Sequence, residues 1–277
     1  MIKIGFIDYY LDEWHANNYP EFIKKCSGGR YEVAYAYGMI DSPVGGMTNE
    51  AWSQKYGVPL VDSIDELIEK SDRIIVLSPD NPEMHEELCK KALASGKLVY
   101  VDKTFAPDKA SAERIFANAD ENNTKCFSSS ALRFSEEFTD VDKSKIDAIY
   151  CESGGDYEVY LIHQIEPVVC FMDAPAKRVM YTGFGEHNSA IIEFEGGKKA
   201  ELRFCKDIPF RFTFVDKEGY AVHKVVESDF FQRFIDAVLE FFDSGEVPVL
   251  HRQTIDVIAI RHAAIMAKEK PFEWVEV

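Results

Sequence analysis

The first half of the chain alternates short, mostly apolar runs with helical segments, and this alternation constrains the fold more than any other feature. We expect strands at residues 2–7, 31–37, 73–77, 98–101 and 125–128. We expect helices between them, at about residues 14–26, 49–56, 64–70, 82–95 and 109–122. Parallel strands joined by crossover helices are covered on both faces, which is why their sequences are nearly continuous apolar runs. The pattern therefore predicts an α/β fold with a doubly wound parallel sheet.

The pattern changes after about residue 130, where adjacent strands replace the alternation. Strands are expected at residues 146–152, 177–184, 189–195, 198–204, 210–215 and 220–226, and helices at about 157–173, 228–243 and 252–268. Gly196-Gly197 and Lys217-Glu218-Gly219 are hairpin turn signals. This predicts an α+β domain with a largely antiparallel sheet. We divide the chain into domains 1–130 and 131–277, with the last helix free to pack back on the first.

Composition excludes several function classes. The 31 basic and 48 acidic side chains give a net charge of -17, which argues against nucleic-acid binding because neutralising phosphates needs clustered Lys and Arg. No stretch has the length and apolarity of a membrane helix, so we predict a cytoplasmic protein without membrane contact. The 6 cysteines form no CxxC pair and none lies at metal-ligand spacing from a histidine, so we assign no metal and no disulfide.

The tripeptide Asp102-Lys103-Thr104 directly follows the apolar run Leu98–Val101. Open α/β sheets bind ligands at the carboxyl ends of their strands, so the Lys103 amine is placed to reach a bound hydroxyl or carbonyl. A solvated lysine at the end of a strand is the simpler alternative. A second candidate is His163, an imidazole on the apolar helix expected at 157–173. A buried structural histidine is the alternative there.

Taken in order along the chain, these motifs resemble those of the Gfo/Idh/MocA (glucose–fructose oxidoreductase/inositol dehydrogenase) family. The resemblance rests on Ser78-Pro79-Asp80 after one strand, His85, Asp102-Lys103-Thr104 after the next, Arg133-Phe134, and His163 on a helix that begins the second domain. It spans nearly the whole chain. It implies a Rossmann-type first domain and reversible oxidation of a hydroxyl of a sugar, polyol or related molecule with NAD or NADP.

The resemblance also implies roles for single residues. Lys103 would hydrogen-bond the reacting oxygen and His163 would exchange its proton, both in a cleft between the two domains. The residues expected at the cofactor are Asp8, Tyr9, Tyr10, Gly38, Ser78, Pro79, His85 and Asp102. The family's catalytic carboxylate falls on Val159, with Glu166 or Glu158 as possible substitutes.

The chain departs from the family at the turn after the first strand. The glycine fingerprint would place glycines at 8 and 10 and a small residue at 13, whereas this chain has Asp8, Tyr10 and Glu13. Glycine lets backbone amides approach a pyrophosphate at a helix amino terminus. A carboxylate about 4 Å from a phosphate costs roughly 4 kcal/mol at an effective dielectric near 20. The second strand also ends without a carboxylate for the ribose or an arginine for a 2′-phosphate.

Two alternatives to the dehydrogenase therefore stay open. One is a descendant without a dinucleotide that acts as a ligand-binding, regulatory or scaffold protein. The other is a lyase or isomerase that uses Lys103 and His163 for proton transfer without a cofactor. For either class we expect a small-molecule ligand. The open face of the antiparallel sheet predicts a homodimer or a higher homo-oligomer.

Overall fold

The computed structural model describes residues 1–277, which form two compact units. Unit 1 contains Met1–Ser129 and Phe234–His251. Unit 2 contains Ser130–Arg233 and Arg252–Val277. The chain therefore leaves unit 1 after the parallel sheet, builds most of unit 2, and returns to unit 1 before it completes unit 2.

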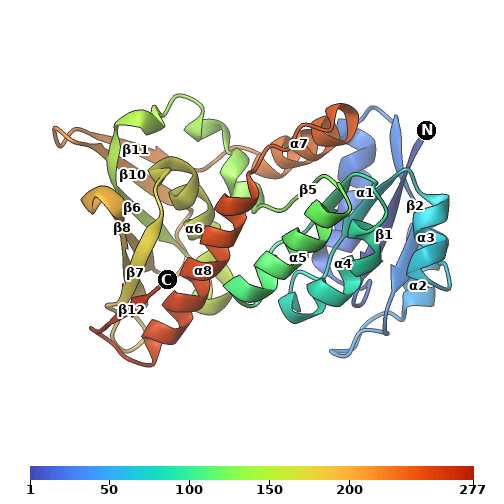
Figure 1. Cartoon of the computed structure of the whole chain (residues 1–277), viewed down its shortest axis with the longest axis horizontal. Helices are drawn as coiled ribbons and strands as arrows, with labels where there is room; N and C mark the ends of the chain where they lie inside the picture. Colours follow the sequence, from blue (N-terminus) through green and yellow to red (C-terminus); the bar gives the residue numbers. More distant parts are fainter. The chain divides into compact units, whose positions relative to one another are not determined.

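Unit 1 is built on a five-stranded sheet whose pairings are all parallel. In the order β2-β1-β3-β4-β5, its strands are β2 (Tyr31–Gly38), β1 (Ile2–Asp8), β3 (Arg73–Val76), β4 (Val99–Val101) and β5 (Cys126–Phe127). The three central strands are almost wholly buried, as expected for strands covered on both faces. The predicted doubly wound parallel sheet is confirmed (Figure 1).

Helices connect these strands, and side-chain caps fix where several of them begin. They are α1 (Trp14–Cys26), α2 (Asn49–Tyr56), α3 (Ile64–Lys70), α4 (His85–Leu93), preceded by a 3₁₀ turn at Pro82–Met84, and α5 (Lys109–Glu121). The side chains of Thr48, Ser63 and Asp108 accept hydrogen bonds from the first-turn amides of α2, α3 and α5. Each cap satisfies an amide that the helix leaves without a partner.

Helix α7 (Phe230–Ser244) brings the returning segment back to unit 1. Its ring at Phe234 lies 5.3 Å from Tyr100 of β4, measured between ring centroids. Phe241 packs edge-on against Phe127 of β5 at 5.1 Å. These aromatic contacts bury large apolar surfaces, which is the main source of stability in such a core. The parallel sheet is thus covered in part by a helix that comes late in the sequence.

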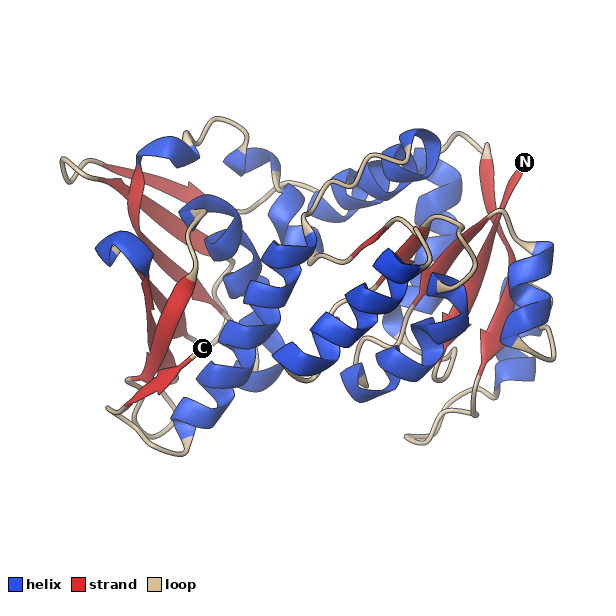
Figure 2. Cartoon of the chain, viewed as in Figure 1, coloured by secondary structure: helices blue, strands red, loops and turns tan.

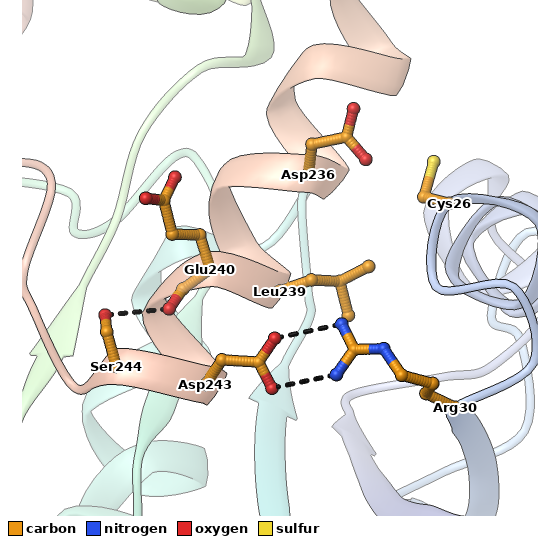
Figure 3. Close-up of a pocket in the computed structure, with 7 residues that line it drawn as sticks. All are labelled: Cys26, Arg30, Asp236, Leu239, Glu240, Asp243 and Ser244. Atoms are coloured by element: carbon orange, nitrogen blue, oxygen red, sulfur yellow. Dashed lines mark hydrogen bonds and ion pairs between the residues drawn. The ribbon is translucent and has the colours of Figure 1, made fainter.

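The end of α7 is fixed to β2 by charged hydrogen bonds. Both terminal nitrogens of Arg30 donate to Asp243, at 3.2 and 2.9 Å. The Tyr31 hydroxyl donates to the same carboxylate at 2.7 Å. Figure 3 shows Arg30 and Asp243 facing each other at a hollow of about 400 Å³. Burial and the bond to Asp243 raise the pKa of Tyr31 to about 12.

Unit 2 is built on a seven-stranded sheet that is antiparallel except for the β6–β9 pair. In spatial order its strands are β11 (Ala221–Val225), β10 (Arg211–Asp216), β6 (Ile146–Ser153), β9 (Lys199–Phe204), β8 (Ser189–Phe194), β7 (Ala176–Tyr181) and β12 (Trp274–Glu276). The predicted α+β class with a largely antiparallel sheet is confirmed.

Unit 2 also contains two long helices, α6 (Tyr157–Met172) and α8 (His251–Lys268) (Figure 2). Leu161, Ile165 and Val168 of α6 are fully buried, and the helix packs against β6 and β9. The Tyr157 hydroxyl donates to the carbonyl of Ala264 in α8 at 3.3 Å. None of the helices in the structure is both long enough and apolar enough to span a bilayer.

We expect a side chain at Gly5 in β1 to destabilise the protein, because α3 lies directly against this residue. A Cβ at Gly5 would lie 2.5 Å from Leu67 Cδ2 and 2.5 Å from Ser71 Oγ. Gly5→Ala should therefore lower the free energy of unfolding by about 1–3 kcal/mol, as overpacked cores do. Urea unfolding followed by circular dichroism measures the change.

The control for Gly5→Ala is the double variant with Leu67→Ala. Removing the Leu67 side chain opens the space that the new Cβ needs. The double variant should therefore lose less stability than the sum of the two single variants. Strict additivity of the three free energies would contradict this packing explanation.

Candidate functional site at the carboxyl edge of the parallel sheet

The turn between β1 and α1 is where a dinucleotide-binding fold carries glycines. Asp8 ends β1 and α1 begins at Trp14, so residues 9–13 form the turn. Tyr10 is only 8% exposed and Leu11 is fully buried. Backbone amides can reach a pyrophosphate only where no side chain stands between them and the phosphate oxygens. Here bulky side chains pack into the turn instead.

The amino terminus of α1 is capped by a carboxylate of the chain itself. Glu13 Oε2 accepts a hydrogen bond from the His15 amide at 2.7 Å, and Oε1 accepts one from the Ala16 amide. A helix amino terminus attracts anions because its first amides lack partners and the helix dipole is positive there. Those amides are the ones that hold phosphate in dinucleotide folds. The residues present therefore do not fit a dinucleotide pyrophosphate in its ordinary place.

A second group of carboxyls lies buried beside this cap. The Tyr100 hydroxyl donates to Asp102 Oδ1 at 2.9 Å, and His15 Nδ1 lies 3.6 Å from Asp102 Oδ2 and 3.1 Å from Glu13 Oε2. Asp8 is 1% exposed, and no side chain donates a hydrogen bond to its carboxyl oxygens. Burial, and then the negative charge of Glu13, raise the pKa of Asp8 well above its ordinary 3.8.

The end of β2 is also closed by side chains of unit 1. The Asn49 side-chain amide donates to the carbonyls of Gly38 and Ile40, at 3.2 and 2.8 Å, and its oxygen accepts from the Leu11 amide at 3.1 Å. A Cβ at Gly38 would lie 2.5 Å from that side chain. The Met39 amide donates to the Asp8 carbonyl at 3.0 Å. Gly38, an expected cofactor contact, thus makes room for Asn49.

The turn after β3 contains three of the residues expected at a cofactor. Ser78 is buried with φ 86°, a conformation that few residues other than glycine adopt, and Pro79 follows it. His85 is fully buried. Its Nε2 lies 2.5 Å from the Leu77 carbonyl and its Nδ1 lies 3.1 Å from the Phe105 carbonyl. Burial lowers the pKa of His85, and its two ring nitrogens connect the segments that follow β3 and β4.

The two expected catalytic residues belong to different units. Lys103 follows β4 in unit 1 and is half-buried, and His163 lies on α6 in unit 2, also half-buried. His163 Nδ1 is 2.8 Å from Ser130 Oγ. The His163 ring meets the rings of Tyr160 and Phe210 edge-on, at centroid distances of 5.5 and 6.1 Å. These contacts fix the orientation of the imidazole within unit 2.

The carboxylates near His163 are bound to cations. Val159, at the position of the family's catalytic carboxylate, is 57% exposed. Glu166 forms a buried ion pair with Arg133 at 2.7 Å, and Glu158 pairs with Lys268 at 2.8 Å. A buried carboxylate that holds an arginine is poorly suited to accept a further proton, because protonation would leave the guanidinium unpaired. Glu166 therefore does not reproduce the missing carboxylate, and Glu158 is an exposed side chain paired with Lys268.

The structure brings together some predicted residues and adds others. Asp8, Glu13 and Asp102 meet at the carboxyl edge of the sheet in unit 1. His15 and Asn49 belong to the same region but were not assigned by sequence analysis. The cap at Glu13 has a weak sequence signal, since Ser, Thr, Asp and Asn are the usual capping residues. No group of three or more His, Cys, Asp or Glu side chains is arranged to hold a metal ion.

Comparisons with known proteins agree with this architecture. Residues 45–130 match the family model GFO_IDH_MocA, described as an oxidoreductase family with an NAD-binding Rossmann fold. The resemblance to the Gfo/Idh/MocA family is confirmed. The matched range includes β3, β4 and Lys103, and it excludes the turn at residues 8–13. A search of curated proteins found no match.

Solved structures of Gfo/Idh/MocA type share the fold across the whole chain. A myo-inositol dehydrogenase from Lactobacillus casei, solved with NAD(H) and myo-inositol, is 15% identical with a TM-score of 0.78, covering 100% of this chain and 96% of its own. A probable dehydrogenase from Thermotoga maritima is 16% identical with a TM-score of 0.77 and 99% coverage of both chains. GenD2 from gentamicin A biosynthesis, solved with NAD, is 13% identical with a TM-score of 0.77, covering 100% and 97%. Identities this low establish the fold and not the activity.

The Asp8 carboxyl predicts an unusual pH dependence of stability. Its folded-state pKa is raised above the unfolded value, so the folded protein keeps a proton that the unfolded chain loses. Stability therefore falls as pH rises through the unfolded pKa toward the folded pKa, by up to about 1.4 kcal/mol per pH unit. Asp8→Asn cannot ionise at this position, so the variant does not lose this stability as the pH rises. Its free energy of unfolding relative to wild type should increase from pH 4 to pH 8.

Urea unfolding at intervals across that range measures the difference. Glu21→Gln is the matched control, because Glu21 is an exposed carboxylate on α1. Its difference from wild type should stay nearly constant over the same range. An Asp8→Asn difference that is equally flat would show that Asp8 ionises normally in the folded protein.

Proposed function

We propose that this chain is an oxidoreductase of the Gfo/Idh/MocA type that interconverts a hydroxyl and a carbonyl on a sugar, polyol or related small molecule, with NAD or NADP. The observation that carries the proposal is Lys103, which follows β4 and Asp102 inside the range that matches the NAD-binding oxidoreductase family. Ligands of open α/β sheets bind at this edge. The fold shared with inositol dehydrogenases supports a polyhydroxylated substrate.

Lys103 is suited to contact the reacting oxygen. The residue is half-buried, and its ammonium can donate up to three hydrogen bonds. A hydroxyl that loses its hydrogen to become a carbonyl passes through a state with negative charge on oxygen. An ammonium held next to that oxygen stabilises the charge more strongly in a partly desolvated site than in water.

His163 is suited to exchange the proton of the same hydroxyl. An imidazole changes its protonation state near neutral pH. His163 Nδ1 lies 2.8 Å from Ser130 Oγ. This contact orients the imidazole ring, and orientation is what a group that transfers a proton needs.

The two places where a dinucleotide ordinarily binds are occupied by side chains of this chain. Glu13 bonds to the two α1 amides that would contact a pyrophosphate, and Asn49 fills the space at the end of β2. A nucleotide bound to this chain therefore has to be held by other groups of the strand edge, or has to displace Glu13.

This disagreement favours a second candidate function. A protein of the same fold without a dinucleotide would bind a small molecule as a regulatory or binding protein, or would use Lys103 and His163 for proton transfer as a lyase or isomerase. The observation behind this candidate is the carboxylate cap at Glu13. The two candidates differ in one measurable property, which is affinity for NAD(P).

Calorimetric titration with NAD(H) and NADP(H) distinguishes the two candidates. Saturable binding in the micromolar range supports the dehydrogenase. No heat and no change in nicotinamide fluorescence up to millimolar nucleotide would reject it in favour of the second candidate. With a bound nucleotide, a panel of sugars and polyols that includes myo-inositol then identifies the substrate class by nicotinamide absorbance.

For an identified substrate, Lys103→Ala and His163→Gln should each lower kcat by about 10²–10⁴-fold, as loss of a proton-transfer or charge-stabilising group does. Nucleotide affinity should change little. Lys109→Ala and His262→Gln are matched controls, because both side chains are exposed. A Lys103→Ala variant with unchanged kcat would remove Lys103 from the reaction.

We further propose that the open face of the unit 2 sheet pairs with a second copy of the chain. The register places Thr213, Tyr150, Glu201, Ile191 and Met180 in one row across that face. Tyr150 is 43% exposed. A two-fold interface needs a self-complementary surface, and this row combines apolar side chains with polar ones that can pair with their symmetry mates.

Native mass spectrometry or sedimentation tests this assembly. The expected species is a dimer or a higher even-numbered oligomer. Tyr150→Glu adds a second charge next to Glu201 in the row and should shift the mass toward the monomer, while Val44→Glu, at an exposed loop position of unit 1, should not. A wild-type protein that is monomeric at micromolar concentration contradicts the proposal.

A further inference from the structure

The capping residue of α1 is chemically unusual. Short side chains such as Ser, Thr, Asp and Asn are preferred at this position because they reach the free amides directly. Glu13 is longer, and its carboxylate bends back so that its two oxygens bond separately to the His15 and Ala16 amides. A phosphate group binds a helix amino terminus in the same way, with its oxygens accepting hydrogen bonds from successive amides of the first turn.

We propose that Glu13 is a built-in substitute for phosphate, whose carboxylate competes with any phosphate or pyrophosphate group for the first-turn amides of α1. The chain therefore limits its own affinity for nucleotides at this edge. This inference concerns the same edge as the proposed function, but it does not depend on which reaction takes place there.

The surroundings of Glu13 hold its carboxylate in that position. Its Oε2 also lies 3.1 Å from His15 Nδ1, and only 4% of its side chain is exposed. A rotation of Glu13 into solvent would break three polar contacts and leave two amides without partners. Unpaired buried amides are costly. A competing phosphate therefore has to replace all of these contacts at once.

Neighbouring carboxylates strengthen the discrimination against phosphate. Asp12 accepts hydrogen bonds from the Met47 amide at 2.7 Å and from the Asn17 side chain at 3.1 Å, so it remains beside the same turn. Asp102 Oδ2 lies 3.6 Å from His15 Nδ1, the same nitrogen that contacts Glu13. Like charges at such distances repel a phosphate that has lost its hydration. The ligands that this edge favours are therefore uncharged hydroxylated molecules or cations rather than phosphorylated ones.

Two substitutions at Glu13 test whether its carboxylate charge, and not its role as a helix cap, weakens phosphate binding. Glu13→Ser keeps a good helix cap while it removes the carboxylate, and Glu13→Asp keeps both the cap and the charge. The probes are inorganic pyrophosphate and NAD, each titrated by calorimetry at low ionic strength. Circular dichroism and thermal unfolding of each variant check that the fold is retained.

Glu13→Ser is expected to bind pyrophosphate at least about tenfold more tightly than wild type, the change that corresponds to about 1.4 kcal/mol, and Glu13→Asp is not. In amide NMR spectra, the His15 and Ala16 signals of Glu13→Ser should be among those that pyrophosphate shifts most. Equal pyrophosphate affinity in wild type and folded Glu13→Ser would overturn the inference.

Titration with NAD separates this inference from the proposed function. Micromolar NAD binding by wild type that Glu13→Ser does not improve would overturn the inference and retain the dehydrogenase. Pyrophosphate binding by Glu13→Ser together with no NAD binding by wild type would support the inference and reject the dehydrogenase. Failure of both proteins to bind either probe would overturn both proposals.

Discussion

The amino terminus of α1 is the constraint around which the carboxyl edge of unit 1 is organised. A helix start at this point of a parallel sheet presents free amides and a partial positive charge, and some anion has to satisfy them. In this chain the anion is Glu13. The fixed negative charge of this carboxylate affects the titratable groups around it. His15 Nδ1 lies 3.1 Å from a Glu13 oxygen and 3.6 Å from an Asp102 oxygen. The pKa of Asp8 rises first because its carboxyl is buried and then because Glu13 is negatively charged.

The same constraint explains how the loop after β2 is held. Here the Met39 and Ile40 amides donate to the carbonyls of Asp8 and Tyr9, and Asn49 bonds to both segments. These bonds satisfy backbone groups that would otherwise face a ligand. The closure is thus a continuous hydrogen-bonded network rather than one obstructing side chain.

Much of the fold could be predicted because apolar periodicity is a local property. The continuous runs at β1 and β3 and the alternating ones in β8 and β9 indicate strands directly. The capping residues at Thr48 and Ser63 mark helix starts. By contrast, β12 was missed because Trp274–Glu276 is short, and its pairing with β7 depends on a contact distant in sequence.

The candidate site was predictable only in part, for the same reason. The absence of glycines at Asp8, Tyr10 and Glu13 is visible in the sequence, and it signals that an ordinary phosphate cradle is missing. What replaces the cradle is not visible, because the Glu13 bonds depend on a rotamer and the Asn49 bonds join segments far apart in the chain. The pairing of Glu166 with Arg133 likewise depends on how two helical segments of unit 2 pack.

The return of α7 to the first unit has a consequence for how the protein is made. The rings at Phe234 and Phe241 complete a core whose other members, Tyr100 and Phe127, are synthesised more than a hundred residues earlier. Domains commonly fold as they emerge from the ribosome, amino-terminal part first. This one cannot finish in that order. Part of the apolar surface of its sheet therefore stays uncovered during synthesis, until the segment Phe234–His251 has been translated.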